Sequence, residues 1–231
     1  MCDDHDHGHD HGHTHIHVHE PVTALPRLGL PAPRFEASTT HGPRRLEDYA
    51  GSWLILFSHP ADFTPVCTTE FMAFAGIHEK LRGMNCELLG LSIDSVHSHI
   101  AWVRNIEAKM GTKVTFPVIA DLNKDVATKY GMISPGESTV ETSRCVFIID
   151  PEQVLRAMIY YPMTTGRSSD EILRVLSALQ TADEHGVATP ADWQPGEPVI
   201  LPPPPTQAEA EERMQTGEAE CTDWYFCKKT L

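Results

Sequence analysis

The sequence predicts an α/β layered fold in which a mixed central sheet is flanked by helices. Short apolar, strand-like runs alternate with longer runs whose apolar residues recur at helical spacing, which is typical of this class. The last two strand-like runs flank a turn at Asp150-Pro151-Glu152, which indicates an antiparallel hairpin. A chain of 231 residues with 41% hydrophobic content is large enough for one packed domain and an appendage.

The elements follow in order along the chain. Residues 21–52 carry several prolines and a polar stretch, and we expect an entry segment with a hairpin there. Strands are expected where apolar runs are short, at 53–57, 87–93, 116–120, 145–149 and 154–161. Helices are expected where apolar spacing is helical or where a cap precedes it, at 68–81, 95–110, 121–130 and 168–180. Ser95, Asp121 and Ser168 supply the caps, and Gly131 ends the third helix.

Composition divides the chain into three parts. Residues 1–20 form a low-complexity, histidine-rich tail, residues 21–185 a folded domain, and residues 186–231 a C-terminal extension. Within the extension, Pro202–Pro205 is a stiff linker, and the acidic stretch 207–215 can form a short helix. This extension is too small to fold alone, so we expect it to pack on another surface.

Charge and cysteine content exclude several classes of protein. Eighteen basic residues against 32 acidic ones give a formal net charge of −14, which argues against nucleic acid or an anionic membrane surface as a partner. No apolar run approaches the roughly 20 residues that cross a bilayer, and no signal-peptide pattern is visible, so a cytoplasmic location is expected. Six cysteines are too few for a disulfide scaffold, which favours catalytic or redox use.

Cys67 lies between the strand-like run 53–57 and a helix-like run, which places its thiol at a helix N-terminus. Free backbone N–H groups and the positive end of the helix dipole favour an anion there. Because the thiolate is the nucleophilic form of cysteine, this position indicates a reactive residue. The alternative is a buried structural cysteine, which is how most single cysteines behave.

The residues around Cys67 fit a reactive site. The Thr64 hydroxyl can donate to the sulfur or to a substrate oxygen, and Pro60 stiffens the loop and shields the sulfur from water. Glu70, about one helical turn after Cys67, can order a cationic partner. His59 lies just before the loop and could reach the sulfur from the end of the strand.

Pro60, Thr64 and Cys67 form the pattern Pro-x-x-x-Thr-x-x-Cys, which resembles the signature of the peroxiredoxins. The resemblance runs from about residue 28 to the C-terminus and favours the 1-Cys subgroup. Further matches are Leu91-Ser92-Ile93-Asp94-Ser95, Ser143-Arg144, Tyr161-Pro162 and Thr164-Thr165-Gly166-Arg167.

This resemblance implies a thioredoxin-like fold with a C-terminal dimerisation arm that crosses onto a partner subunit. It implies a thiol-dependent peroxidase that acts on hydrogen peroxide and organic hydroperoxides in antioxidant and redox homeostasis. A thioredoxin-like or other thiol would serve as reductant, no cofactor would be required for catalysis, and a homodimer would assemble into a decamer-type ring. The Cys-x-x-Cys motif of thioredoxin itself is absent from the sequence.

Two arginines match the cationic side of such a site. A peroxide-cleaving site needs positive charge to hold the thiolate and the developing alkoxide, and arginine stays charged. Arg144 opens a predicted strand and matches the family's active-site arginine, while Arg167 matches a second arginine of the subgroup. Cys145 is expected on the opposite sheet face, and Cys86 is expected to be structural.

Cys221 and Cys227 enclose an aromatic centre in the C-terminal extension. This spacing resembles archaeal-type members of the subgroup, which implies that Cys227 of a partner subunit resolves oxidised Cys67 and that Cys221 exchanges onward. A zinc site at the two cysteines is the alternative, weakened by the lack of a nearby histidine. The lipase-like Gly-x-Ser-x-Gly motif of mammalian relatives is not matched, because this chain has Ala50-Gly51-Ser52-Trp53-Leu54.

Histidine occupies every odd position of the N-terminal tail from 5 to 19. Such tracts are candidates for binding Zn, Ni, Cu or Co, and a cloning tag is the alternative. The histidines are His5, His7, His9, His11, His13, His15, His17 and His19. The tail therefore supports a second function beside the peroxidase, a metal-sequestering protein. The resemblance to the peroxiredoxins implies a third, an oligomeric holdase chaperone.

Overall fold

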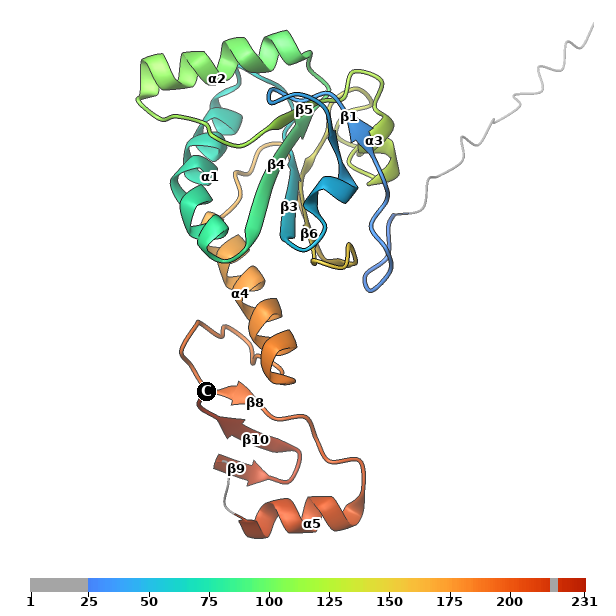
Figure 1. Ribbon diagram of the computed structural model, residues 1–231, viewed down its shortest axis with the longest axis vertical. Coiled ribbons are helices and arrows are strands. Elements are labelled where there is room, and N and C mark those ends of the chain that lie inside the picture. The colour runs from blue at the N-terminus through green and yellow to red at the C-terminus, as the bar shows by residue number, and fades with distance from the viewer. Residues whose placement is uncertain (1–24, 217–219) are drawn as a thin grey trace, which may run out of the picture.

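The computed structural model describes residues 25–216 and 220–231, and its centre is a five-stranded mixed sheet (Figure 1). The strand order is β5-β4-β3-β6-β7. The strands are β3 (Trp53–Ser58), β4 (Cys86–Ser92), β5 (Val118–Ala120), β6 (Arg144–Ile149) and β7 (Leu155–Tyr161). β3, β4 and β5 are parallel, whereas β6 and β7 run antiparallel to their neighbours, which confirms the predicted mixed sheet.

Helices cover both faces of this sheet. α1 (Pro65–Gly83), α2 (Val96–Met110) and α4 (Ser169–His185) contribute to one apolar cluster, together with alternate residues of β3 such as Ile55 and Phe57. The 3-10 helix η1 (Leu46–Tyr49) and α3 (Asp125–Lys129) belong to the cluster on the other face, with Leu54 and Leu56. All six residues of β3 are buried, because this central strand has a packed layer on each side.

The edges of several elements differ from prediction for local reasons. α1 begins at Pro65, three residues before the predicted start, because Thr64 is its N-cap and proline fits the first helical position. α3 begins at Asp125 and not at residue 121. Asp121 stays outside the helix, where its two carboxylate oxygens accept from the N–H groups of Val126 (3.2 Å) and Ala127 (2.7 Å). The entry segment forms the predicted hairpin, β1 (Glu36–Ala37) with β2 (Arg44–Arg45).

The C-terminal extension forms an arm beyond the end of α4, away from the central sheet (Figure 1). It contains β8 (Val199–Ile200), α5 (Gln207–Thr216), β9 (Glu220–Asp223) and β10 (Phe226–Lys229). The three strands pair in the order β8-β10-β9, and a disulfide joins Cys221 to Cys227. No helix among the described residues is both long and apolar enough to cross a membrane.

Candidate active site

Cys67 lies in the first turn of α1, where the chain leaves β3 through a short loop. The residue is fully buried and forms no disulfide among the described residues. Its place near the helix N-terminus is the one predicted, and the helix dipole there favours a thiolate.

Arg144, the first residue of β6, holds the thiol from the neighbouring strand. Its Nη1 lies 3.3 Å from the Cys67 sulfur, and its Nε donates to the Met163 carbonyl at 2.9 Å. The arginine is buried, so little water screens its charge from the sulfur. The sequence placed Arg144 at this site, and the structure brings the two side chains together.

Glu70 links both predicted arginines. Its carboxylate accepts from Arg144 Nη1 at 2.6 Å and from Arg167 Nε and Nη2, each at 2.8 Å. Burial alone would raise the pKa of the Glu70 carboxyl, but the hydrogen bonds and charge of Arg167 outweigh burial and hold the pKa below its usual range. Arg167 also donates through Nη1 to the Cys145 carbonyl at 2.7 Å, so it reaches Cys67 only through Glu70 and Arg144.

Two other predicted contacts differ in the structure. The Thr64 hydroxyl donates to the Ala61 carbonyl at 2.8 Å, so it shapes the loop and is not directed at the sulfur. His59 Nε2 lies 3.0 Å from Asp62, and His59 Nδ1 has no hydrogen-bond partner among the described residues. The predicted contact between His59 and the sulfur is therefore not made as a hydrogen bond. Pro60 is buried in the loop, as expected of a residue that shields the sulfur.

A buried polar cluster that the sequence did not reveal lies beside this loop. Asp62 accepts from His59 and lies 2.9 Å and 3.0 Å from Nδ1 of His99, a residue of α2. The ligand atoms of these three side chains lie within 4.8 Å of one another, a spacing that could also hold a metal ion. Asp62 is separated from His99 by 37 residues, and no motif in the sequence links them.

The other cysteines lie where the sequence predicts structural roles. Cys145 packs in the apolar cluster opposite the one that contains Cys67, and burial raises the pKa of its thiol to about 12. Cys86 is buried in the core, and burial likewise raises the pKa of its thiol strongly. The disulfide between Cys221 and Cys227 leaves neither residue bound to Cys67 in this state.

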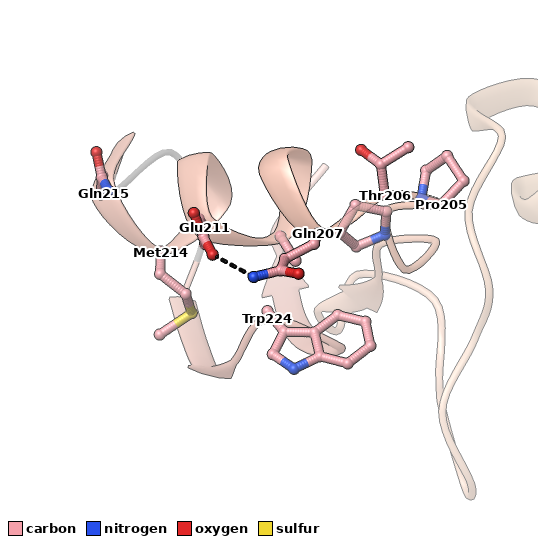
Figure 2. A pocket seen from close by; sticks show the side chains of 9 residues that line it. Pro205, Thr206, Gln207, Glu211, Met214, Gln215 and Trp224 are labelled. Atoms are coloured by element: carbon pink, nitrogen blue, oxygen red, sulfur yellow. Dashed lines mark hydrogen bonds between the residues drawn. The ribbon is translucent and has the colours of Figure 1, made fainter.

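The remaining predicted ligands and an apolar cavity lie elsewhere. The eight tail histidines precede the described residues. An apolar cavity of about 720 Å³ lies on the arm between α5 and the β9–β10 hairpin, lined by residues that include Pro205, Met214 and Trp224 (Figure 2). None of its lining residues belongs to the Cys67 site.

Comparison with known proteins decides the family. Residues 28–158 match the AhpC/TSA family, and residues 178–217 match the C-terminal domain of 1-Cys peroxiredoxin. A peroxiredoxin of Aquifex aeolicus is 57% identical over 222 residues, covering 91% of this chain and 99% of the relative. The chain belongs to the peroxiredoxin family. A peroxiredoxin of Methanosarcina mazei is 54% identical over 214 residues, covering 89% of this chain and 98% of the relative.

Solved structures agree with this peroxiredoxin assignment. A yeast mitochondrial 1-Cys peroxiredoxin superposes with a TM-score of 0.81 at 39% identity, covering 90% of this chain and all of that one. A cysteine-to-serine mutant of peroxiredoxin 6 from Arenicola marina gives a TM-score of 0.79 at 37% identity, covering 89% and 98% of the two chains. These matches confirm the predicted thioredoxin-like fold and the predicted enzyme class, a thiol-dependent peroxidase that needs no cofactor for catalysis.

Proposed function

We propose that this peroxiredoxin reduces hydrogen peroxide and small organic hydroperoxides with the Cys67 thiolate as nucleophile. The observation that carries the proposal is the 3.3 Å contact between Arg144 Nη1 and the Cys67 sulfur at the N-terminus of α1. A fixed, buried guanidinium stabilises the thiolate before attack and the charge on the departing oxygen during it.

The reaction follows from this geometry. The thiolate attacks the distal peroxide oxygen, a sulfur–oxygen bond forms, and the oxygen–oxygen bond breaks. The departing oxygen takes up a proton and leaves as water or alcohol, while Cys67 becomes a sulfenic acid. Glu70 and Arg167 touch neither sulfur nor substrate in this scheme; they hold Arg144 in place.

The test is the oxidation state of Cys67 after one equivalent of hydrogen peroxide. We expect prompt peroxide consumption by the wild type, none by Cys67→Ser, and wild-type consumption by the matched variant Cys86→Ser, whose thiol is buried in the core. An unmodified Cys67 in folded wild-type protein would exclude the proposal. Peptide mapping by mass spectrometry gives the site of modification directly.

For the second half of the cycle, we propose that Cys227 of the partner subunit resolves the sulfenic acid. Its thiol displaces water from oxidised Cys67 and forms an intersubunit disulfide. Cys221 then attacks Cys227, releases Cys67 as a thiol and leaves a Cys221–Cys227 disulfide for an external thiol to reduce. The observed disulfide between Cys221 and Cys227 is the expected product of this exchange and supports a thiol–disulfide exchange between the two residues.

A single substitution tests that order. In Cys221→Ser, the onward exchange is blocked, so a crosslink between Cys67 and Cys227 should accumulate after peroxide treatment. The double variant Cys221→Ser/Cys227→Ser should retain a sulfenic acid on Cys67 instead. Equal crosslinking with and without Cys227 would contradict the assignment.

Two further predictions accompany this function. The first is that the chain forms homodimers that assemble further into a decamer-type ring, in which the C-terminal arm packs against a partner subunit. The apolar cavity beside Trp224 on the arm supports such packing (Figure 2). Light scattering of the full chain measures the assembly directly.

Metal binding by the eight tail histidines is tested by titrating metal into the full chain and into a chain that begins at Glu20.

A further inference from the structure

Two buried hydroxyl groups fasten the end of β3 to the segment that leads into β6. Ser58, the last residue of β3, donates from its Oγ to the Ser143 carbonyl at 2.7 Å, and the same Oγ accepts from the Cys145 N–H at 3.2 Å. Thr142 donates in the opposite direction, from its Oγ1 to the His59 carbonyl at 2.7 Å. Both hydroxyl-bearing residues are fully buried, so water does not compete for these bonds.

The two partners of Ser58 are the residues on either side of Arg144. The ladder between β3 and β6 ends at Phe57, which lies opposite Val146. Beyond this pair, the Ser58 hydroxyl binds the carbonyl group before Arg144 and the N–H group after it. On its β3 side, Arg144 is therefore positioned through a serine side chain, at the point where the regular ladder has ended.

The Ser58 hydroxyl lies on the sheet face opposite Cys67. Side chains alternate along a strand, so Ser58 shares the face of Leu56. Leu56 and Cys145 belong to one apolar cluster, whereas Cys67 belongs to the cluster on the other face. Ser58 can therefore influence Cys67 only through the backbone beside Arg144, which distinguishes it from a catalytic residue.

We propose that Ser58 is a positioning residue, whose hydroxyl clamps the backbone on both sides of Arg144 and so holds the guanidinium against Cys67. The proposal rests on the function proposed above for Cys67. The guanidinium end of the same arginine is held by Glu70 and by the Met163 carbonyl, so the arginine is fixed at its backbone and at its charged group. A charge fixed in this way stabilises the thiolate without having to reorganise during the reaction.

Thr142 supports the same clamp from the segment before β6. It precedes Arg144 by two residues, and its acceptor is the carbonyl of His59, the first residue after β3. The loop that leads to Cys67 starts at this residue. The bond thus ties the start of the Cys67 loop to the segment that carries Arg144, and a shift of either segment would break it.

Removal of the Ser58 hydroxyl leaves neither of its backbone partners unpaired. The Cys145 N–H also donates to the Ser143 carbonyl at 3.1 Å, so these two groups stay bonded to each other in Ser58→Ala. Because no buried polar group loses its only partner, the variant is expected to fold. The backbone around Arg144 then gains freedom relative to β3.

The rate of Cys67 oxidation by hydrogen peroxide tests the clamp in the full chain. Ser58→Ala should react about tenfold more slowly than the wild type, because a small displacement of a positioned group is costly. The thiolate absorbance of Cys67 at neutral pH, taken as the difference from a Cys67→Ser counterpart in each background, should fall as well. The matched control is Ser177→Ala, which removes a 2.9 Å hydroxyl bond to the Leu173 carbonyl in α4 and should change neither quantity.

Thr142 gives a second pair of variants that does not depend on Ser58. Thr142→Val keeps the shape of the side chain and removes its hydroxyl, so the reaction with peroxide should slow. Thr142→Ser keeps the hydroxyl and should react faster than Thr142→Val. The reverse order would overturn the clamp, since loss of a methyl group would then matter more than loss of the hydrogen bond.

The outcomes separate the clamp from the proposed function. Provided that the wild type reacts, a folded Ser58→Ala in which either the rate or the thiolate absorbance keeps its wild-type value would overturn the proposal. If wild-type Cys67 does not react with peroxide, the proposed function is wrong, yet the absorbance of Ser58→Ala still decides the positioning role. If Ser58→Ala does not fold, the pair of Thr142 variants decides it.

Discussion

Replacement of Glu70 by glutamine should destabilise the protein strongly, although it changes only one oxygen to an amide. The carboxylate accepts four hydrogen bonds, one from Arg144 and three from Arg167. Glutamine keeps one acceptor oxygen, so at least two of these bonds are lost. At about 1.5–3 kcal/mol for each bond to a charged group, the loss is about 3–6 kcal/mol. Removal of one partner from a buried ion pair gives a similar figure, about 3–5 kcal/mol.

Urea unfolding at fixed protein concentration measures this free energy. The matched control is Glu79→Gln on the same helix, whose 3.5 Å ion pair with Arg82 is largely exposed and should matter little. We expect Glu70→Gln to lower the midpoint of thermal unfolding by roughly 6–24 °C, from about 2–4 °C for each kcal/mol in a chain of this size. A loss below about 1 kcal/mol at neutral pH would refute the reasoning, since it lies within the range of ordinary surface changes.

The pH dependence gives a second check on Glu70. Its pKa is lowered in the folded state from an ordinary value of 4.5. Its stabilising contribution is therefore complete above pH 4.5 and is lost as the pH falls from there through the folded-state pKa, because the unfolded chain takes up the proton first. The difference in the free energy of unfolding between wild type and Glu70→Gln should be constant from neutral pH down to about pH 4.5, and it should become smaller below that pH. A gap that widens on acidification would contradict this account.

Three further substitutions test separate parts of the structure. Arg144→Gln removes the guanidinium 3.3 Å from Cys67 and should slow peroxide reduction about a hundredfold or more in stopped-flow kinetics, while a loss below tenfold would contradict its role. Ser95→Ala removes the side-chain cap of α2, a 3.1 Å bond from the Ser98 N–H, and should cost about 1 kcal/mol in urea unfolding with unchanged activity. Gly90→Ala places a methyl group 3.2 Å from Phe57 in the core and should cost about 1–3 kcal/mol; thermal unfolding at the wild-type midpoint would show that the aromatic ring moves freely.

The parts of the fold predicted from sequence are those set by local patterns. Each strand of the central sheet lies where an apolar run predicts it, because burial on both faces leaves an uninterrupted apolar signature. The predicted start of α3 at residue 121 was wrong, because an acidic capping residue does not specify how many residues separate it from the first turn of the helix. Asp121 satisfies backbone N–H groups of α3 from four residues before its start, across a turn in which Lys124 has a φ of 60°.

The sequence predicted those residues of the site that lie in recognisable motifs, and it did not predict contacts between residues that no motif links. The positions of Cys67, Arg144 and Arg167 followed from sequence, and Glu70 was expected near a cation. The pairing of His59 with Asp62, and of Asp62 with His99, depends on how α2 packs against the loop, which no spacing encodes. The disulfide between Cys221 and Cys227 likewise depends on the β9–β10 hairpin, which the sequence did not predict.

The contacts around Cys67 also constrain when its site can be assembled during synthesis of the chain. Arg144 lies 77 residues after Cys67, and Arg167 lies 97 residues after Glu70. When Cys67 has just emerged from the ribosome, neither Arg144 nor Arg167 has been translated. The thiol of the nascent chain therefore lacks both of these guanidinium groups. The contact between Arg144 and Cys67 therefore forms only after β6 has been made, and the contact between Arg167 and Glu70 only after the turn before α4 has been made. On the function proposed above, Cys67 lacks its cationic partner until most of the domain has been synthesised.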